Sequence, residues 1–317
     1  MARRRRGLPI DGVLLLDKPK GMSSNFALQR ARRLYQAQKA GHTGTLDPMA
    51  TGLLPVLFGE ATKFSNQLLE ADKVYRTRVE LGQSTDTGDA EGEVIAEAPV
   101  PALEHSGVAS VVANFIGEQD QLPPMYSALK HQGRKLYELA REGKSVDRAT
   151  RRIRVYDARL LSASLEGESP GFDLEVRVSK GTYVRTLAED MAKALGCEGH
   201  ISQLRRLKTG PFDADGMVDF DTLEAQDDGQ RQARLAPIDS LLQHLPAHRL
   251  SEAGVQALRF GRPARGELEG GDSAMAEESL YRLYQGESFI GLGLVEPTGD
   301  IVPRRLLSTF VAGSGQD

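Results

Sequence analysis

The sequence has no tryptophan and only one cysteine, Cys197, among 317 residues. A single cysteine forms no intrachain disulfide and cannot supply a multi-cysteine zinc site. Such usage is typical of a reducing, cytoplasmic compartment. Long apolar runs are missing too, because stretches such as Val13-Leu16 and Leu53-Phe58 fall far short of the ~20 residues that span a bilayer. These absences predict a cytoplasmic protein with no membrane partner.

The signatures of common cofactor and hydrolase sites are also missing. The sequence contains no G-x-x-x-x-G-K-[ST] phosphate loop, no G-x-G-x-x-G between a strand and a helix, and no H-E-x-x-H, C-x-x-C or G-x-S-x-G. Its 6 histidines are too scattered to indicate a metal site. We therefore expect neither a nucleotide cofactor nor a metal ion.

The chain as a whole lacks the basic excess that is usual in nucleic-acid-binding proteins, because its formal net charge is -4. That value averages over segments of opposite sign. Residues 1–70 carry 11 basic and 5 acidic residues, residues 127–154 carry 9 and 3, and residues 177–208 carry 7 and 3. Folding could gather these segments into one positive face, or they could simply be solvated surface. The acidic residues concentrate in 71–126, 155–176, 213–239 and the tail.

Hydrophobic periodicity indicates a mixed α+β fold. Alternation predicts half-buried strands over Val74-Leu81, with Tyr75 on the apolar face, and over Phe172-Ser179. The remaining expected elements are a buried strand over Gly12-Lys18, a helix from Ser23 or Ser24 to about Tyr35, a polar loop over Gln83-Gly92, and a helix over Thr182-Leu195 closed by Gly196.

The pattern divides the chain into three parts. A basic tail covers residues 1–9, and its Arg3-Arg6 run is either a solvated tail or an arm that touches phosphate. Residues 10–245 form the main body. From residue 246 to 317 the chain is Gly-rich with short strand-like runs, which predicts a small β domain.

One segment, Gly41-Gly52, stands out because it packs three glycines and a proline around Asp47. A structural interpretation makes Asp47 the N-cap of a helix with Pro48 at its first position. An N-cap does not need the glycine-rich approach, however, which lets another chain come close to the backbone. The alternative makes Asp47 a nucleophile or base on a loop open to a large substrate.

These residues resemble the TruB-type tRNA pseudouridine-55 synthases. The similarity extends over roughly residues 10–210, as a series of blocks in the order of the family. The blocks are Asp17-Lys18-Pro19 with Gly21-Ser24, Gly41-Pro48 with Ala50-Pro55, Gly59-Lys63, Lys73-Tyr75, Pro124-Lys130, Lys180-Thr186 and Leu204-Leu207. The tail after about residue 247 resembles, more weakly, a PUA-type RNA-binding domain.

The resemblance implies a pseudouridine synthase fold: a central, mainly antiparallel mixed sheet flanked by helices, plus a small PUA-like C-terminal domain. It implies conversion of the T-loop uridine at position 55 of tRNA to pseudouridine, without a cofactor. Asp47 would be the essential carboxylate and Arg185 the cation that keeps it ionised. The structural alternative for Arg185 is a surface pair with Glu189, four residues on.

The same resemblance implies roles around the target base. Tyr75 would stack on the base and Leu204 would cover its far side, whereas both could instead be ordinary core residues. His42 would fill the space left by the flipped base, or be a turn residue. Tyr183 and Lys130 join the substrate-binding set. Lys18 is included in it as well, although Lys18-Pro19 resembles a segment that supports the active-site loops.

The expected partner is the T stem-loop of tRNA, bound by a monomer without an obligatory protein partner. Two other interpretations stay open: a non-catalytic module that binds or folds RNA, and a related synthase acting on guide-directed or ribosomal RNA. Basic residues of one segment are candidates for phosphate contacts. They are Lys130, Arg134, Lys135, Arg141, Lys144, Arg148, Arg151, Arg152 and Arg154.

Overall fold

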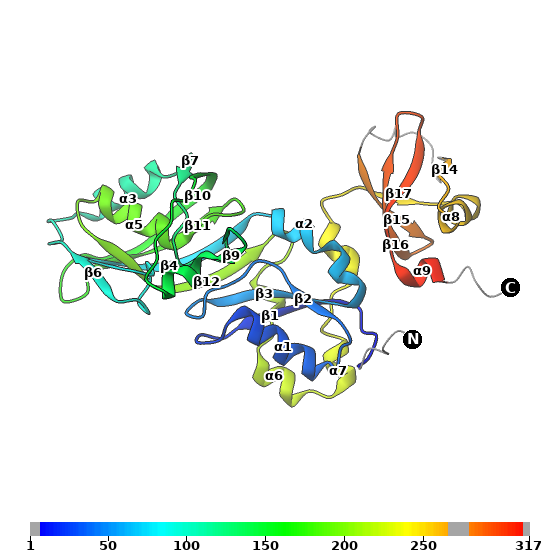
Figure 1. Cartoon of the computed structure of the whole chain (residues 1–317), viewed down its shortest axis with the longest axis horizontal. Coiled ribbons are helices and arrows are strands. Elements are labelled where there is room, and N and C mark those ends of the chain that lie inside the picture. Colours follow the sequence, from blue (N-terminus) through cyan, green and yellow to red (C-terminus); the bar gives the residue numbers. More distant parts are fainter. Residues whose placement is uncertain (1–6, 266–278, 313–317) are drawn as a thin grey trace.

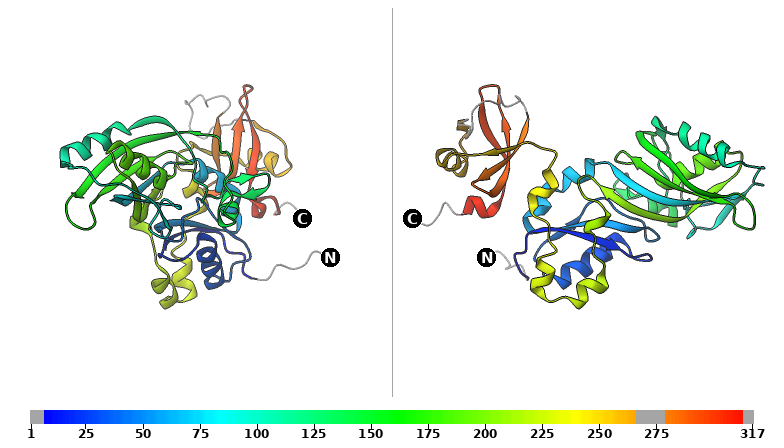
Figure 2. Two further views of the ribbon diagram at one scale, coloured as in Figure 1. Left: turned by 60° about the vertical axis from the view of Figure 1, so that its left-hand side comes forward. Right: turned by 180° about the vertical axis from the view of Figure 1, so that it is seen from behind.

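A computed structural model describes residues 7–265 and 279–312 of the chain. The Arg3-Arg6 run therefore lies outside the described residues. Most of the chain forms an elongated body, and a smaller lobe stands at one end of it (Figures 1 and 2). Within the described ranges, no helix is long and apolar enough to cross a membrane.

An eight-stranded sheet runs through the body (Figure 1). All neighbouring strands pair antiparallel except β3 and β12, which are parallel, so the expectation of a mainly antiparallel mixed sheet is confirmed. The strands follow the order β1 (Gly12–Lys18), β3 (Thr51–Phe58), β12 (Gly199–Thr209), β4 (Lys73–Leu81), β11 (Gly171–Val178), β10 (Arg151–Ser164) and β7 (Gly117–Gln121), with β2 (Ala40–His42) on β3.

Three helices form much of the core with this sheet. Helix α1 (Ser24–Leu34) begins at Ser23, whose side chain accepts from the Phe26 amide, and it buries Ala27, Leu28 and Ala31 beside β2 and β3. Helices α3 (His105–Asn114) and α5 (Val184–Ala194) pack against β10 and β12 respectively, and against each other. The alternating apolar residues of β4 and β11 meet these helices in one continuous cluster.

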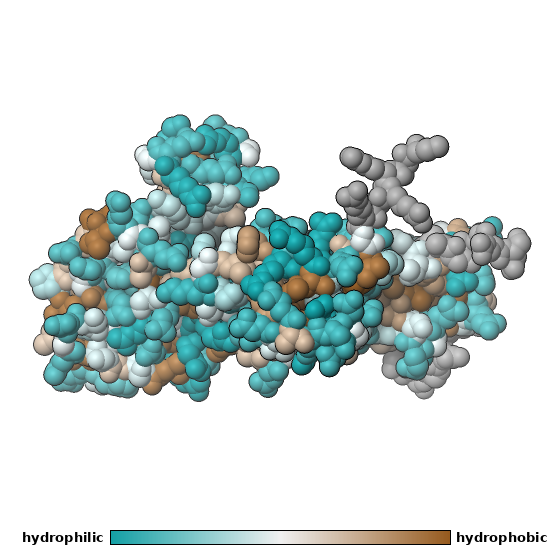
Figure 3. All heavy atoms as spheres, turned by 90° about the horizontal axis from the view of Figure 1, so that it is seen from below, coloured by the Kyte–Doolittle hydropathy of each residue, from teal (hydrophilic) through white to brown (hydrophobic). Residues whose placement is uncertain are grey.

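Short elements fill the connections. They are η1 (Gly59–Phe64), α2 (Ser65–Glu70), the pair β5 (Gln83–Thr85) and β6 (Val94–Glu97), the hairpin β8 (Lys130–His131) and β9 (Arg134–Lys135), α4 (Leu136–Arg141), η2 (Ala214–Gly216), α6 (Phe220–Ala225), α7 (Asp228–Gln232) and η3 (Ile238–Leu242). Viewed from below, the surface is mostly hydrophilic and its apolar residues form scattered patches (Figure 3).

A five-stranded sheet builds the smaller lobe. Its order is β13 (Ala247–Arg249), β15 (Leu280–Gln285), β16 (Ser288–Val295), β17 (Asp300–Leu306) and β14 (Ala264–Arg265), accompanied by α8 (Glu252–Arg259) and α9 (Ser308–Ala312). The lobe contacts the body through η1. The Lys63 ammonium donates to the Ser308 hydroxyl at 2.7 Å, and the rings of Phe64 and Phe289 lie 5.6 Å apart.

The structure confirms the expected strands and α1, and it corrects three details. Helix α5 begins at Val184, because Thr182 and Tyr183 keep non-helical backbone conformations. The polar stretch after Leu81 is not all loop, since its first three residues form β5. Asp47 does not cap a helix: residues 47–50 form a turn in which the Ala50 amide donates to the Asp47 carbonyl at 3.1 Å.

The strands β1, β2 and β3 join the rest of the sheet where β3 pairs with β12. At this point Gly52 pairs with Arg206 and has a φ of 96°. A Cβ at this position would lie 2.3 Å from the Arg206 carbonyl oxygen. We expect Gly52→Ala to lower the free energy of unfolding by about 3 kcal/mol or more, from left-handed strain plus the clash. Denaturant titration would measure the loss.

Gly21→Ala is the matched control. Gly21 also has a left-handed φ, of 78°, but an added Cβ there would meet nothing within 4 Å. Its cost should be only the left-handed penalty of about 1 kcal/mol. Equal losses in the two variants would contradict the steric explanation.

Candidate active site

A pocket of about 300 Å³ opens between the loop before β3, the start of β4, the end of β11, the middle of β12 and the start of α5. Five of the residues singled out in the sequence line it: Asp47, Tyr75, Tyr183, Arg185 and Leu204. Residues far apart in the sequence therefore meet in one cavity. Among the described residues, no group of His, Cys, Asp or Glu side chains is placed to hold a metal ion.

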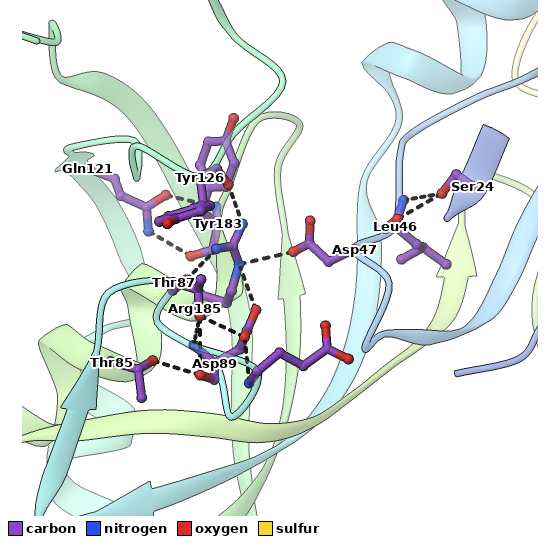
Figure 4. Close-up of polar contacts among 11 residues, drawn as sticks. Ser24, Leu46, Asp47, Thr85, Thr87, Asp89, Gln121, Tyr126, Tyr183 and Arg185 are labelled. Carbon is purple, nitrogen blue, oxygen red and sulfur yellow. Dashed lines mark hydrogen bonds and ion pairs between the residues drawn. The ribbon is translucent and has the colours of Figure 1, made fainter. Parts of the chain in front are cut away.

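The loop that carries Asp47 is anchored on both sides. The Ser24 hydroxyl donates to the carbonyl of Leu46 and accepts from its amide, both at 2.8 Å (Figure 4). On the other side, the Lys18 ammonium donates to the carbonyls of Pro19, Met22 and Pro48. These bonds hold the loop at the residues directly before and after Asp47.

Lys18 belongs to the predicted substrate-binding set, but it is not among the residues that line the pocket. The Lys18 side chain is completely buried, and its ammonium group donates hydrogen bonds to three backbone carbonyls. Burial lowers the pKa of Lys18 to about 8. The structure therefore favours the interpretation that Lys18 supports the active-site loops.

An ion pair joins Asp47 to Arg185 in the pocket, with Oδ2 and Nε 3.0 Å apart. The Asp47 side chain is 37% exposed, whereas that of Arg185 is 4% exposed. The other guanidinium nitrogens donate to the carbonyls of Thr87 and Tyr126. The alternative interpretation, a surface pair between Arg185 and Glu189, is wrong. The guanidinium of Arg185 points into the pocket wall instead (Figure 4).

A second carboxylate, Asp89, lies behind this pair. Its Oδ2 is 4.0 Å from Nε of Arg185, and its Oδ1 accepts from the Thr87 hydroxyl and the Glu91 amide. Asp89 is buried in a stretch that the sequence presents only as a polar loop. Nothing in that stretch's composition distinguishes this aspartate from its exposed neighbours.

Burial dominates the electrostatics of the pair. It raises the pKa of Asp47 above 3.8, while the charge of Arg185 and the hydrogen bond from it lower the pKa again. The nearby Asp89 charge raises the pKa of Asp47 further. Arg185 thus supplies the positive charge that favours the ionised carboxylate in a partly dry site.

Aromatic and aliphatic side chains form another part of the pocket wall. Tyr75 of β4 is half-buried, and Leu204 of the adjacent β12 is 7% exposed. Val178 of β11 joins them. Such a wall fits the flat face of a nucleobase. The Tyr183 ring lies near Arg185, and burial raises the pKa of its hydroxyl.

Two buried cations in the wall were not predicted as site residues. Arg206 is 1% exposed and donates to the carbonyls of Leu53 and Gly44, at 2.7 and 3.0 Å. Lys73 donates to three carbonyls at the end of α2, and burial lowers its pKa to about 8. Both belong to blocks of the family resemblance, which was the available signal.

His42 and Lys130 lie outside the pocket lining. His42 is the last residue of β2 and partly buried, and burial together with Arg206 lowers the pKa of its imidazole. The neutral ring is therefore favoured. Lys130 is exposed on the β8–β9 hairpin.

The basic segment 127–154 contains two kinds of residue. Some charges are already matched by acidic neighbours: Arg152 lies 3.1 Å from Glu118 and 3.5 Å from Asp120, and Arg134 and Lys144 pair with Glu142. Arg148 donates to the Pro123 carbonyl, and Arg154 approaches Glu118 at 4.0 Å. By contrast, Lys135 and Arg141 lie over the Tyr137 ring.

In a comparison with known protein families, three family models match parts of this chain. Residues 32–184 match "TruB family pseudouridylate synthase (N terminal domain)", residues 185–243 match "tRNA pseudouridylate synthase B C-terminal domain", and residues 246–307 match "Pseudouridine synthase II TruB, C-terminal". Together these segments extend over most of the chain.

Similar curated proteins carry one name, tRNA pseudouridine synthase B. That of Chromohalobacter salexigens is 60% identical over 309 residues, which cover 98% of each chain, and that of Cupriavidus pinatubonensis is 52% identical over 94% of each. Among solved structures, a Cbf5-Nop10-Gar1 complex contains a chain with a TM-score of 0.67 at 22% identity, covering 96% of this chain and 91% of that one. This structural likeness shows the fold.

The raised pKa of Asp47 has a consequence for stability. An acid with a higher pKa in the folded than in the unfolded chain binds protons on folding, so its contribution to stability falls as the pH rises above 3.8. Asp47→Asn removes this titration. We expect the melting temperature of the variant to improve relative to the native protein between pH 4 and pH 7.

Asp219→Asn is a control of opposite sign. The hydrogen bond from Thr222 lowers the pKa of Asp219, so the stability it contributes is lost as the pH falls below 3.8. The disadvantage of this variant should therefore shrink toward pH 3. A melting difference for Asp47→Asn that is independent of pH would contradict the raised pKa.

Proposed function

Because the chain belongs to the TruB family of pseudouridine synthases, whose known activity is to isomerise uridine to pseudouridine in tRNA, we propose that it modifies the T-loop uridine at position 55. The observation that carries this proposal is the Asp47–Arg185 pair, 3.0 Å apart, in a pocket walled by Tyr75 and Leu204. A module that only binds RNA needs no such partly buried carboxylate.

The residues fit the demands of the isomerisation. The bond between N1 of uracil and the ribose breaks, the base turns, and a bond forms from C5 to the same ribose carbon. The proton on C5 is released and N1 becomes protonated, so the reaction imports no group and needs no oxidant. The ionised Asp47 acts at the sugar and base, and Arg185 keeps it charged and oriented.

The base must leave its stack to reach this pocket, which costs a few kcal/mol. We propose that Tyr75 and Leu204 offset the cost by holding the flipped base between them, with Tyr183 beside it. His42, which lies outside the pocket and has a neutral ring, would occupy the space that the base vacates.

We also propose a division of labour along the chain. Residues 10–245 form the catalytic unit, and residues 246–317 form an RNA-binding unit similar to a PUA domain. The separate five-stranded sheet of the small lobe supports this division, and the contact between η1 and α9 fixes the lobe against the body. Two distant contacts on one RNA would then favour intact tRNA over an isolated arm.

Replacing Asp47 tests the assignment directly. Asp47→Ala should release less than about a thousandth of the native amount of tritium from a T-arm transcript carrying C5-tritiated uridine. The affinity for tRNA should stay within about threefold, because phosphate contacts supply most of it. Asp221→Asn, an exposed aspartate on α6, is the matched control and should retain full activity.

The position is tested with the same assay. A transcript with cytidine at position 55 and labelled uridine elsewhere should release no tritium. Release from that transcript would overturn position 55, and normal release by Asp47→Ala would overturn the catalytic assignment. Pseudouridine mapping in RNA from a deletion strain would identify any ribosomal target.

The basic segment makes a further prediction about binding. Neutralising Lys130, Lys135 and Arg141 together should flatten the dependence of tRNA affinity on salt, by about 0.7–0.9 in log-log slope for each phosphate that is no longer neutralised. Arg152→Ala should change the slope less, because Glu118 and Asp120 already match its charge. Equal slope changes per residue would contradict this distinction.

A further inference from the structure

The start of α5 determines where Arg185 lies, yet it has no side-chain cap of its own. The N-cap residue is Tyr183, and its side chain makes no capping hydrogen bond. Arg185 follows two residues later, and its Nε must reach Asp47 at 3.0 Å. Because the long Arg185 side chain starts in this first helical turn, a small shift of the turn displaces the guanidinium.

Gln121, the last residue of β7, holds this turn from outside the helix. Its side-chain Oε1 accepts from the Tyr183 amide at 2.8 Å, and its Nε2 donates to the Tyr183 carbonyl at 3.1 Å (Figure 4). The same carbonyl accepts the first intrahelical bond, from the Leu187 amide at 3.0 Å. The Gln121 amide therefore fixes both backbone polar groups of Tyr183.

Gln121 is buried, so its hydrogen bonds to Tyr183 cannot be replaced by bonds to water. The residue is 3% exposed, so loss of either bond would leave a buried polar group without a partner. Its backbone belongs to the sheet through pairing with Arg151 of β10. The two hydrogen bonds between Gln121 and Tyr183, called here the clamp, thus connect the edge strand of the sheet to the helix turn that carries Arg185.

We propose that Gln121 is a positioning residue for the isomerisation, which acts through the Tyr183 backbone to hold Arg185 on Asp47. The proposal rests on the proposed function. An amide is needed here because it accepts and donates at once: a carboxylate would only accept, and an apolar side chain would do neither. Gln121 itself is not in the pocket lining and need not touch RNA.

Gln119 provides the matched control. It lies two residues earlier on β7, on the same side of the strand, and its amide donates to the Phe115 carbonyl at 2.9 Å. That bond joins β7 to the end of α3, away from the pocket. Gln119→Met therefore removes a comparable side-chain bond from the same strand without touching α5.

The test compares Gln121→Met with Gln119→Met in single-turnover assays on tRNA. Gln121→Met should lower the rate of isomerisation by roughly ten- to a hundredfold, since a misplacement near 1 Å costs about that much, with tRNA affinity unchanged. The acidic limb of its pH-rate profile should move to higher pH, because Asp47 loses part of its pairing. Gln119→Met should match the native rate.

Gln121→Glu separates the two bonds. An ionised glutamate keeps an acceptor for the Tyr183 amide but loses the donor to its carbonyl, whereas a protonated one keeps both. The rate of this variant should therefore fall further below that of the native protein as the pH rises and the glutamate ionises. A cooperative melting transition would show that this variant still folds. A native rate for both Gln121 variants, or reduced tRNA affinity with an unchanged rate, would overturn the proposal.

A measurement without RNA distinguishes this result from failure of the proposed function. In the RNA-free protein, the melting temperature of each variant is compared with that of its Asp47→Asn version as the pH changes, which gives the pH at which Asp47 titrates. This pH should rise in Gln121→Met and not in Gln119→Met. If native protein released no tritium, the proposed function would fail while this comparison still tested the clamp. An unchanged titration of Asp47 would overturn it.

Discussion

The site depends on one ion pair, formed by a buried guanidinium and a partly exposed carboxylate. Arg185 contributes the buried side, and its remaining nitrogens are held by the carbonyls of Thr87 and Tyr126. Three segments must therefore be in place before Asp47 has its partner: the turn after β5, the loop before β8, and the first turn of α5. Taking such a cation out of water is expensive unless each donor is satisfied, and here the backbone of two loops satisfies it.

The same solution recurs around the pocket. Lys18, Lys73 and Arg206 are each nearly or fully buried, and each donates to two or three backbone carbonyls. Lys18 and Arg206 hold the loop around Asp47 through the carbonyls of Pro48 and Gly44, and Lys73 holds the end of α2. The charge of Lys18 lowers the pKa of Asp47, and the three cations together place positive charge around the pocket, which favours an anionic RNA although the whole chain carries a net charge of -4.

Local patterns predicted the elements better than they predicted the site. Alternation located β4 and β11, and a serine cap located α1, because those signals lie within one stretch of sequence. Asp47 and Arg185 were found through blocks of the family resemblance, whereas local chemistry alone favoured a helix cap and a surface pair. Asp89 and Gln121 were missed, because the contacts that connect them to the site, with Arg185 and Tyr183 respectively, join residues distant in the chain and produce no periodic pattern.

The parallel pairing of β3 with β12 has a consequence for how the protein folds. Only Thr51 and Gly52 of β3 pair with Arg205 and Arg206 of β12, and this short seam joins the N-terminal strands to the rest of the sheet. The antiparallel pair of β1 and β3 can form early in a nascent chain, but the seam waits until β12 has left the ribosome. The pocket is thus a late product of a high-contact-order topology, and a chain that stalls before β12 lacks the part of the pocket wall that Leu204 and Arg206 provide.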